Sequence, residues 1–313
     1  MAAPSTVFTQ VLAATAYKRL QQKGFADNVF NGLRTLGILV ERGGKERLDG
    51  GNSIAVPLEY AENGTAEWIA PYGQYNLAPQ DNFTAAEFDW KSVAGTITHT
   101  QKEAVQNSGE SMMLNLIAAK MRNLEKTLRA RLSDAFFNDG TNALQPVGLD
   151  AIITTTGTLG GIPRSGNDWW KANVDSTTEG LTPEDMETMH NNCTHNLDEP
   201  TLIVTTQALY EKYGQFAQSF AEITKGSGGT ADIGFQHYEY KSVPLIWDAD
   251  CPSGSMFFLN WDYLKIYVHE DWEFKPGEMK ESELQPLWRM PINWWGGFCP
   301  SNCRMLGALR NKS

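Results

Sequence analysis

One long helix is the feature of this sequence that most constrains its fold. Asn107 and Glu110 have the form of a capping box, and Asn138-Asp139-Gly140 ends the pattern that follows. A helix over residues 108–137 has about 30 residues and a length of roughly 45 Å, far above the average of about 11–12 residues. It must therefore lie across a large sheet or along a subunit. Its apolar side chains recur at steps of three and four, at Met113, Ile117, Met121, Leu124, Leu128, Leu132 and Phe136.

An unusually long connection joins two predicted strands. Residues 52–60 alternate between apolar and polar side chains, which predicts a strand, and Pro57 restricts it to an edge or an exposed ribbon. Residues 86–98 are predicted to be the returning strand. The connection of about 25 residues greatly exceeds the median of about 4–6 for compact domains. The sequence therefore predicts a long hairpin with a function of its own.

In the rest of the chain, helices and strands alternate without the regular strand–helix–strand order of βαβ units. Helices are predicted from Thr182 to His190 and near residues 207–213. This pattern favours an α+β fold with an antiparallel sheet. The predicted strands are residues 202–206, 243–247, 256–259, 264–270 and 305–309.

The net charge of −11 is distributed unevenly along the chain. Residues 1–47 carry seven Lys or Arg against three acids, whereas residues 48–90 carry seven acids and no Lys or Arg. Such an acidic chain does not bind nucleic acid strongly over its whole surface, because neutralising phosphates requires clustered Lys and Arg. The sequence shows neither a signal peptide nor an apolar run of about 20 residues, so we expect synthesis in a cytoplasm, no membrane contact, and four free, mostly buried cysteines.

No constellation of residues predicts catalysis, a metal site or a cofactor. His190, Cys193 and His195 supply only half of the ligand pattern of a structural zinc site. The glycine-rich stretches 160–164 and 226–229 match no phosphate-binding motif and are interpreted as turns. The pairs Trp169-Trp170 and Trp294-Trp295 would suit a sugar-stacking platform, but buried core or interface positions are favoured.

Seven short segments form a set that is specific in its order and spacing. They are Asp49–Ile54, Thr84–Trp90, Gln106–Glu110, Phe137–Thr141, Gly148–Ile152, Gly234–His237 and Trp294–Gly296. Together they resemble the major capsid proteins of tailed bacteriophages, which have the Hong Kong 97-like fold. The resemblance extends from about residue 15 to the C-terminus.

The resemblance implies a role for each part of the chain. It implies a non-enzymatic subunit that assembles with itself into the pentamers and hexamers of an icosahedral shell around double-stranded DNA. The protein would be made in the bacterial host cytoplasm and located in the virion. Alternatives are an encapsulin-type shell and a carbohydrate-binding protein. The implied parts are an N-terminal arm (1–47), an extended loop (48–98), a peripheral domain (99–174) with spine helix 108–137, an axial domain (175–245), and return strands of the peripheral domain (246–313).

Two departures from the family pattern affect the expected partners. The arm begins almost at once, without a long scaffolding segment, so a separate scaffolding protein is expected, together with a portal and, where the shell needs one, a cement protein. The founding fold cross-links its subunits through a lysine of the extended loop, but residues 48–90 contain no lysine. Noncovalent contacts must then hold the shell. The basic arm is expected to make non-specific contact with packaged DNA.

We expect the acidic loop of one subunit to lie across basic surface of its neighbour. Arg122, Lys126 and Arg129 follow one another at i, i+4 and i+7, which places them on one side of the long helix. The alternative is that this stripe is simply a solvated helix face. The loop residues expected at the interface are Glu59, Glu62, Glu67, Trp68, Tyr72, Tyr75 and Asp81.

Overall fold

The computed structural model describes residues 34–100, 102–103, 110–219, 238–278, 280–281 and 285–313. They divide into two compact units. The described first unit comprises Val93–Leu132 and Trp272–Trp294, apart from the gaps above, and the second comprises Arg34–Ser92, Ser133–Asp271 and Trp295–Ser313. Most of the predicted arm, the predicted cap at Asn107 and the predicted turn at 226–229 lie outside the described residues.

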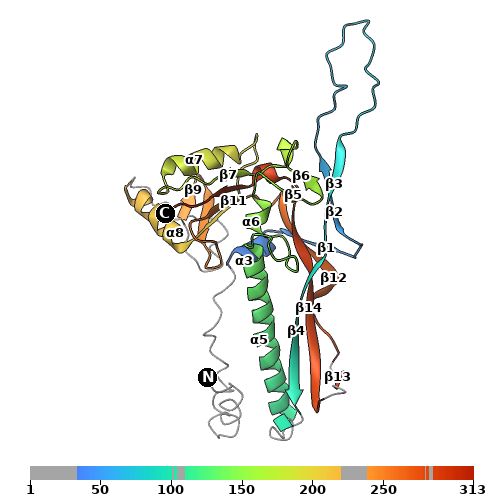
Figure 1. Cartoon of the computed structure of the whole chain (residues 1–313), viewed down its shortest axis with the longest axis vertical. Coiled ribbons are helices and arrows are strands. Elements are labelled where there is room, and N and C mark those ends of the chain that lie inside the picture. The colour runs from blue at the N-terminus through green and yellow to red at the C-terminus, as the bar shows by residue number, and fades with distance from the viewer. Residues whose placement is uncertain (1–33, 101, 104–109, 220–237, 279, 282–284) are drawn as a thin grey trace. The chain divides into compact units, whose positions relative to one another are not determined.

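A helix packed on strands forms the first unit (Figure 1). Helix α5 (Glu110–Phe136) has 27 residues and closely matches the predicted span of 108–137. Its Met121, Leu124 and Leu128 pack with Ile97 and Met290 of the strands, which confirms this part of the predicted apolar stripe. The unit contains β13 (Lys280–Glu281) and the parts of three longer strands that fall within its residues: β4 (Lys91–Thr100) from Val93, β12 (Leu264–Pro276) from Trp272, and β14 (Leu287–Pro300) up to Trp294. Strand β14 pairs with the other three.

A six-stranded sheet forms the centre of the second unit. Its order is β7 (Asn173–Asp175), β15 (Gly307–Leu309), β11 (Met256–Leu259), β8 (Leu202–Thr205), β10 (Val243–Trp247) and β9 (Tyr238–Tyr240). The strands β10 and β8 are parallel, as are β15 and β7, while the other pairs are antiparallel. The prediction of an antiparallel sheet is therefore wrong in part. Helix α8 (Gln207–Ser219) lies in the connection between β8 and β10. Parallel strands need such a long crossover connection, which is usually helical.

Two helices cover one face of this sheet. Helix α7 (Pro183–Asn192) starts with a capping box between Thr182 and Asp185, which fixes its first turn. Met186 and Met189 of α7 and Leu209 of α8 share one apolar cluster with the strands. All four cysteines are free and buried, as predicted; burial raises the pKa of the Cys193 thiol to about 12.

Shorter elements complete the second unit. Helix α3 (Arg34–Glu41) is held by Thr35, whose hydroxyl donates to Asp248 at 2.6 Å. Strand β1 (Lys45–Leu48) runs parallel to β12. Within the described residues, no helix is both long and apolar enough to cross a membrane. The remaining elements are α6 (Leu149–Ile152), β5 (Thr158–Leu159), β6 (Ile162–Pro163), η1 (Asp168–Trp170) and η3 (Cys303–Met305).

The predicted hairpin is a two-stranded ribbon of β2 (Ile54–Glu59) and β3 (Phe83–Phe88). The predicted returning strand, 86–98, is divided between β3 and β4, and only β3 pairs with β2. The break falls at Trp90, whose indole N–H donates to the carbonyl of Gly51 at 3.0 Å. This contact joins the segment after β3 to the segment before β2 at the base of the ribbon.

Candidate subunit-interface surfaces

The base of the extended loop is anchored on the second unit. Ile54, Val56 and Leu58 of β2 are buried, because alternate side chains of a strand share one face. The Glu87 N–H donates to the carbonyl of Gly160 at 2.9 Å. A Cβ at Gly160 would lie 2.8 Å from the Cβ of Ala86, so the close approach requires glycine there. The ribbon therefore leaves the unit in a defined direction.

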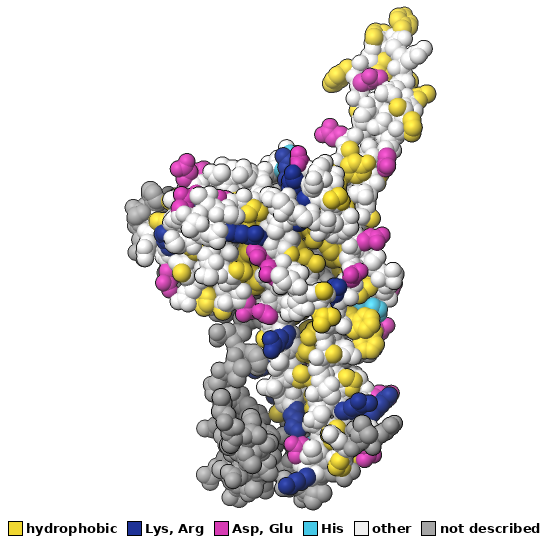
Figure 2. Space-filling model, in the orientation of Figure 1, with side chains coloured by type: hydrophobic (Ala, Val, Ile, Leu, Met, Phe, Trp, Pro, Cys, Tyr) yellow, Lys and Arg dark blue, Asp and Glu magenta, His cyan; other side chains and the backbone are white. Residues whose placement is uncertain are grey.

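The tip of the loop, residues 60–82, exposes large aromatic side chains. Trp68 and Tyr72 are fully exposed, and Tyr75 is 79% exposed. Hydrogen bonds inside the tip are local, such as the bond from the Tyr60 hydroxyl to the carbonyl of Asp81 at 2.6 Å. Figure 2 shows apolar side chains gathered on this tip. Clusters of exposed apolar side chains are typical of interaction surfaces.

The predicted interface acids of the loop are exposed as well. Glu59 ends β2, while Glu62, Glu67 and Asp81 belong to the tip. Residues 48–90 contain no Lys or Arg, so these carboxylates have no cationic neighbour inside the loop. The surface thus combines aromatic side chains with uncompensated negative charge, which suits a partner surface that is apolar and basic.

The predicted basic stripe lies on α5 in the first unit. Arg122 and Lys126 are exposed, as a binding role requires. Arg129 is exposed too, and its guanidinium donates to the Glu125 carboxylate at 2.5 Å and lies 5.9 Å from the centre of the Phe274 ring.

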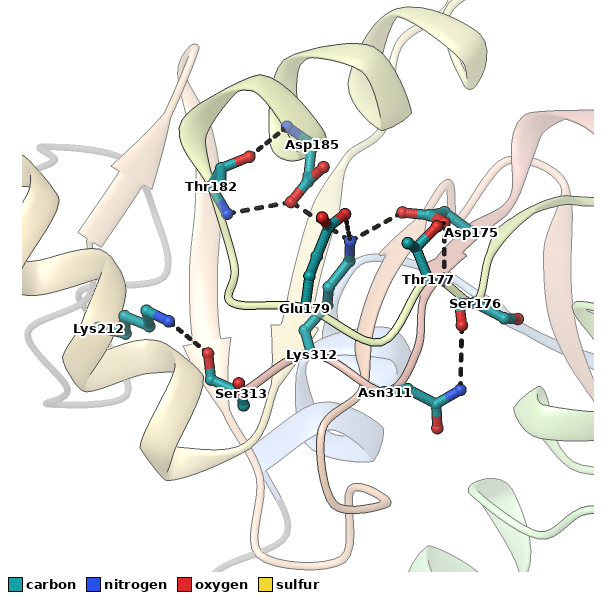
Figure 3. Close-up of polar contacts among 10 residues, drawn as sticks. All are labelled: Asp175, Ser176, Thr177, Glu179, Thr182, Asp185, Lys212, Asn311, Lys312 and Ser313. Carbon is teal, nitrogen blue, oxygen red and sulfur yellow. Dashed lines mark hydrogen bonds and ion pairs between the residues drawn. The ribbon is translucent and has the colours of Figure 1, made fainter.

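A buried lysine in the second unit was not foreseen (Figure 3). The Lys312 ammonium lies 2.9 Å from a carboxylate oxygen of Asp175, 3.0 Å from one of Glu179 and 3.3 Å from one of Asp185, and its side chain is fully buried. A bridge between Glu179 and Lys312 brings the C-terminal segment beside residues 175–185. No local sequence pattern could have revealed partners more than 120 positions away.

This cluster has the geometry of a cation site in which lysine supplies the cation. The three carboxylates place ligand atoms within 4.8 Å of one another. Desolvation by burial opposes ionisation of Asp175, but hydrogen bonds from Thr177 and the contact with Lys312 lower its pKa to about 2. Burial likewise disfavours the charged form of Lys312, yet its three carboxylate partners raise its pKa above the usual value. These contacts fasten the C-terminal segment to residues 175–185.

The other residues considered for chemistry are placed in the core or in turns. His190 is buried, with its ring 5.8 Å from that of Tyr240, and His195 closes a tight turn with Asp198. One tryptophan of each adjacent pair, Trp170 and Trp294, is buried. This burial leaves no exposed two-ring platform for a sugar and favours the core interpretation of the pairs.

Comparison with solved structures defines the class of protein. The chain is similar to the capsid asymmetric unit of cyanophage A-1(L), with a TM-score of 0.73, 16% identity, and coverage of 92% of this chain and 95% of that one. It is also similar to the capsid of Myoviridae phage XM1 (TM-score 0.55, 10% identity, coverage 92% and 94%). The SrpI encapsulin of Synechococcus elongatus PCC 7942 shares the architecture (TM-score 0.60, 12% identity, 94% of both chains). The fold is therefore the Hong Kong 97-like fold of shell-forming subunits.

A match to a protein-family model distinguishes between a phage capsid protein and an encapsulin. Residues 92–285 match the SU10 major capsid protein model, and this match spans more than half of the chain. No curated protein sequence matches. The chain belongs to the SU10 major capsid protein family: it is a major capsid protein, a structural subunit of the virion shell that associates with copies of itself, as the resemblance predicted.

Proposed function

We propose that this chain forms the pentamers and hexamers of an icosahedral shell around packaged double-stranded DNA, and that residues 60–82 bind a neighbouring subunit. The exposure of Trp68, Tyr72 and Tyr75 at the end of an anchored ribbon supports this proposal most strongly. In this scheme residues 48–98 act as the extended loop, 175–245 as the axial domain and 246–313 as return strands.

Aromatic burial would supply most of the binding free energy of the loop. An aromatic side chain buries roughly 150–250 Å², which at about 25 cal/mol per Å² corresponds to about 4–6 kcal/mol before the entropic cost of association. Exposed ion pairs contribute only about 0–1 kcal/mol each. The loop acids and the stripe of Arg122, Lys126 and Arg129 would therefore set orientation rather than affinity.

The remaining partners follow from the role of the shell. A separate scaffolding protein, a portal and a cement protein would assist assembly, and the chain would be made in the host cytoplasm. The net positive residues 1–47 would meet packaged DNA non-specifically, because phosphate contact needs clustered Lys and Arg. The subunit would perform no catalytic step, since its contribution is mechanical.

Truncating the loop aromatics tests the proposal directly. The double variant Trp68→Ala/Tyr72→Ala should fold normally and yield few closed shells by electron microscopy, because its tip loses its apolar contact area. Leu197→Ala is the matched control, since Leu197 is 97% exposed in a turn outside the loop; it should leave the shell yield unchanged. Wild-type shell yield from the double variant would refute the assigned role of the loop.

A further inference from the structure

Strand β7 forms one edge of the six-stranded sheet, and a single residue of this edge is open to pairing. In a parallel pair, successive residues bond alternately toward the partner strand and away from it. The Asn173 N–H donates to the carbonyl of Leu306 at 3.1 Å. The Asp175 carbonyl accepts a hydrogen bond from the Arg310 N–H at 2.7 Å. Both residues therefore point toward β15, and the N–H and C=O of Val174 between them point to the open edge.

The neighbours of Val174 on this edge already have partners. The Ala172 N–H donates to the carbonyl of Thr154 at 3.3 Å. The Ser176 carbonyl accepts a hydrogen bond from the Asn311 carboxamide at 3.2 Å. Within the described part of the chain, the N–H and C=O of Val174 have no such partner on this edge. One donor and one acceptor thus remain for the backbone of an added strand.

A groove of about 440 Å³ is lined by this edge and by helix α7. We call it the α7–β7 groove. Val174 lines it, together with the buried Met189 and Leu309. Three exposed polar residues of α7 line it as well and follow one another at i, i+4 and i+8, which places them on one side of the helix; they are Glu184, Thr188 and Asn192. Binding sites are typically concave, with volumes of about 300–1,000 Å³, so the groove is large enough for a ligand.

The α7–β7 groove is acidic. Its described lining includes the carboxylates of Asp175, Glu184 and Asp185 and no Lys or Arg. Lys312 is shared among three carboxylates, those of Asp175, Glu179 and Asp185 (Figure 3). Among the described residues, Glu184 has no cationic partner. The groove therefore keeps negative charge that no cation of the described chain balances, and a partner that brings a cation would complement it.

We propose that the α7–β7 groove binds an extended segment of another protein, with a lysine or arginine opposite Val174. The backbone of that residue would exchange two hydrogen bonds with Val174. Directly opposite residues share one face of a sheet, so its cationic side chain would lie in the groove with Glu184. Main-chain bonds would supply affinity and the groove specificity, as in other cases of strand addition. The inference concerns a partner of the single subunit and does not depend on shell assembly.

The charge of this chain argues against a second copy as the occupant. Residues 141–313 carry 22 acids against 12 Lys or Arg, so two copies of this part repel each other. The basic stripe of Arg122, Lys126 and Arg129 lies on α5. A helix cannot pair with a strand edge, because its main-chain groups bond within the helix. A partner protein with a basic extended segment fits both the charge of the groove and the open edge.

Titration of unassembled subunits with the peptide acetyl-Thr-Val-Arg-Val-Thr-amide, followed by methyl NMR, tests the groove. The methyl signals of Met189 and Leu309 should shift saturably. At saturation the Val174 amide should exchange with deuterium at least about tenfold more slowly, since a paired amide exchanges only after local opening. The absence of a saturable shift would overturn the inference.

Two altered peptides separate charge from main-chain pairing. A peptide with leucine in place of arginine should bind about threefold more weakly, the effect of one partly exposed ion pair. A peptide N-methylated at arginine cannot donate to the Val174 carbonyl and should also bind more weakly. Binding of either peptide as tight as that of the original would overturn the inference.

Two charge variants of α7 separate the groove from the general charge of the helix. Glu184→Gln removes the unbalanced carboxylate and should weaken binding of the arginine peptide about threefold. Glu187→Gln is the matched control, since Glu187 lies on the same helix and pairs with Lys241 at 3.1 Å; it should leave binding unchanged. Equal losses from the two variants, or no loss from Glu184→Gln, would overturn the inference.

Hydrogen–deuterium exchange on assembled particles identifies the source of the occupant. The segment that contains Val174 should exchange as fast in shells of this chain alone as in unassembled subunits, and about tenfold more slowly in complete virions. Protection in shells of this chain alone would give the groove to a second copy and overturn the assignment to another protein. Fast exchange in virions would overturn the inference. Neither result affects the proposed function, which only a failure to form shells would refute.

Discussion

Replacing Lys312 by methionine should destabilise the subunit by about 2–3 kcal/mol at neutral pH. Exposed ion pairs contribute about 0.2–1 kcal/mol each, and removing one partner of a fully buried pair costs about 3–5 kcal/mol. Lys312 lies between these limits, because its side chain is fully buried while its partners Asp175, Glu179 and Asp185 are 31%, 48% and 18% exposed. Methionine keeps an apolar side chain of similar length, so the decrease in the free energy of unfolding reports the contribution of the ammonium group and its ion pairs.

The effect of the substitution on stability should depend on pH in a defined direction. In the wild type the pKa of Asp175 is lowered from 3.8 to about 2, so its contribution is complete above pH 3.8 and is lost as the pH falls toward 2. In Lys312→Met the Asp175 carboxylate loses its cationic partner and keeps two acidic neighbours, so its pKa rises. Protonation relieves the repulsion among these carboxylates, so the difference between variant and wild type should shrink below about pH 4.

Urea unfolding of unassembled subunits, followed by tryptophan fluorescence, measures the free energy of unfolding of Lys312→Met and of the wild type. Urea is uncharged, so it does not screen the ion pairs as a salt would. Lys171→Met is the matched control, since Lys171 pairs with one exposed carboxylate, Asp168; it should change stability little. A Lys312→Met variant as stable as the control, or a deficit that stays constant from pH 7 to pH 3, would refute the reasoning.

Four further predictions concern the helix stripe and the backbone. Lys126→Glu/Arg129→Glu should lower shell yield in electron micrographs while leaving thermal unfolding of the subunit nearly unchanged; unaltered assembly would argue for a solvated face. Gly148→Ala should destabilise by more than about 2 kcal/mol in urea unfolding, because its Cβ would lie 2.5 Å from backbone atoms of Asn138. In contrast, Gly37→Ala, with open space around it in α3, should stabilise by about 0.5–1 kcal/mol. Ser242→Gly should stabilise by up to about 1 kcal/mol, because Ser242 has a φ of 68°; a loss of stability would contradict this.

Local patterns in the sequence were sufficient for the elements that depend on them. The period of the apolar side chains predicted α5 to within two residues at its start and one at its end. Strands β10 and β11 were predicted at their observed bounds. The length of the connection, rather than any motif, revealed the loop and its exposed Trp68.

Features that depend on distant contacts were missed. The division between β3 and β4 falls at Trp90, whose indole N–H donates to the carbonyl of Gly51, 39 positions away. The parallel pairing of β15 with β7 joins segments that lie far apart in the sequence, as in the pair Gly307 and Asn173. Strand β14 was not predicted, although Met290, Ile292 and Trp294, which are buried in it, alternate in the sequence with less buried residues.

Cryo-electron microscopy of the assembled shell tests the central claim most directly. The measurement is the exposed fraction of Trp68, which is fully exposed in the isolated chain. If the extended loop binds a neighbouring subunit, Trp68 will be buried against another copy of the chain in every capsomer. A closed shell in which Trp68 remains in contact with solvent alone would contradict the account.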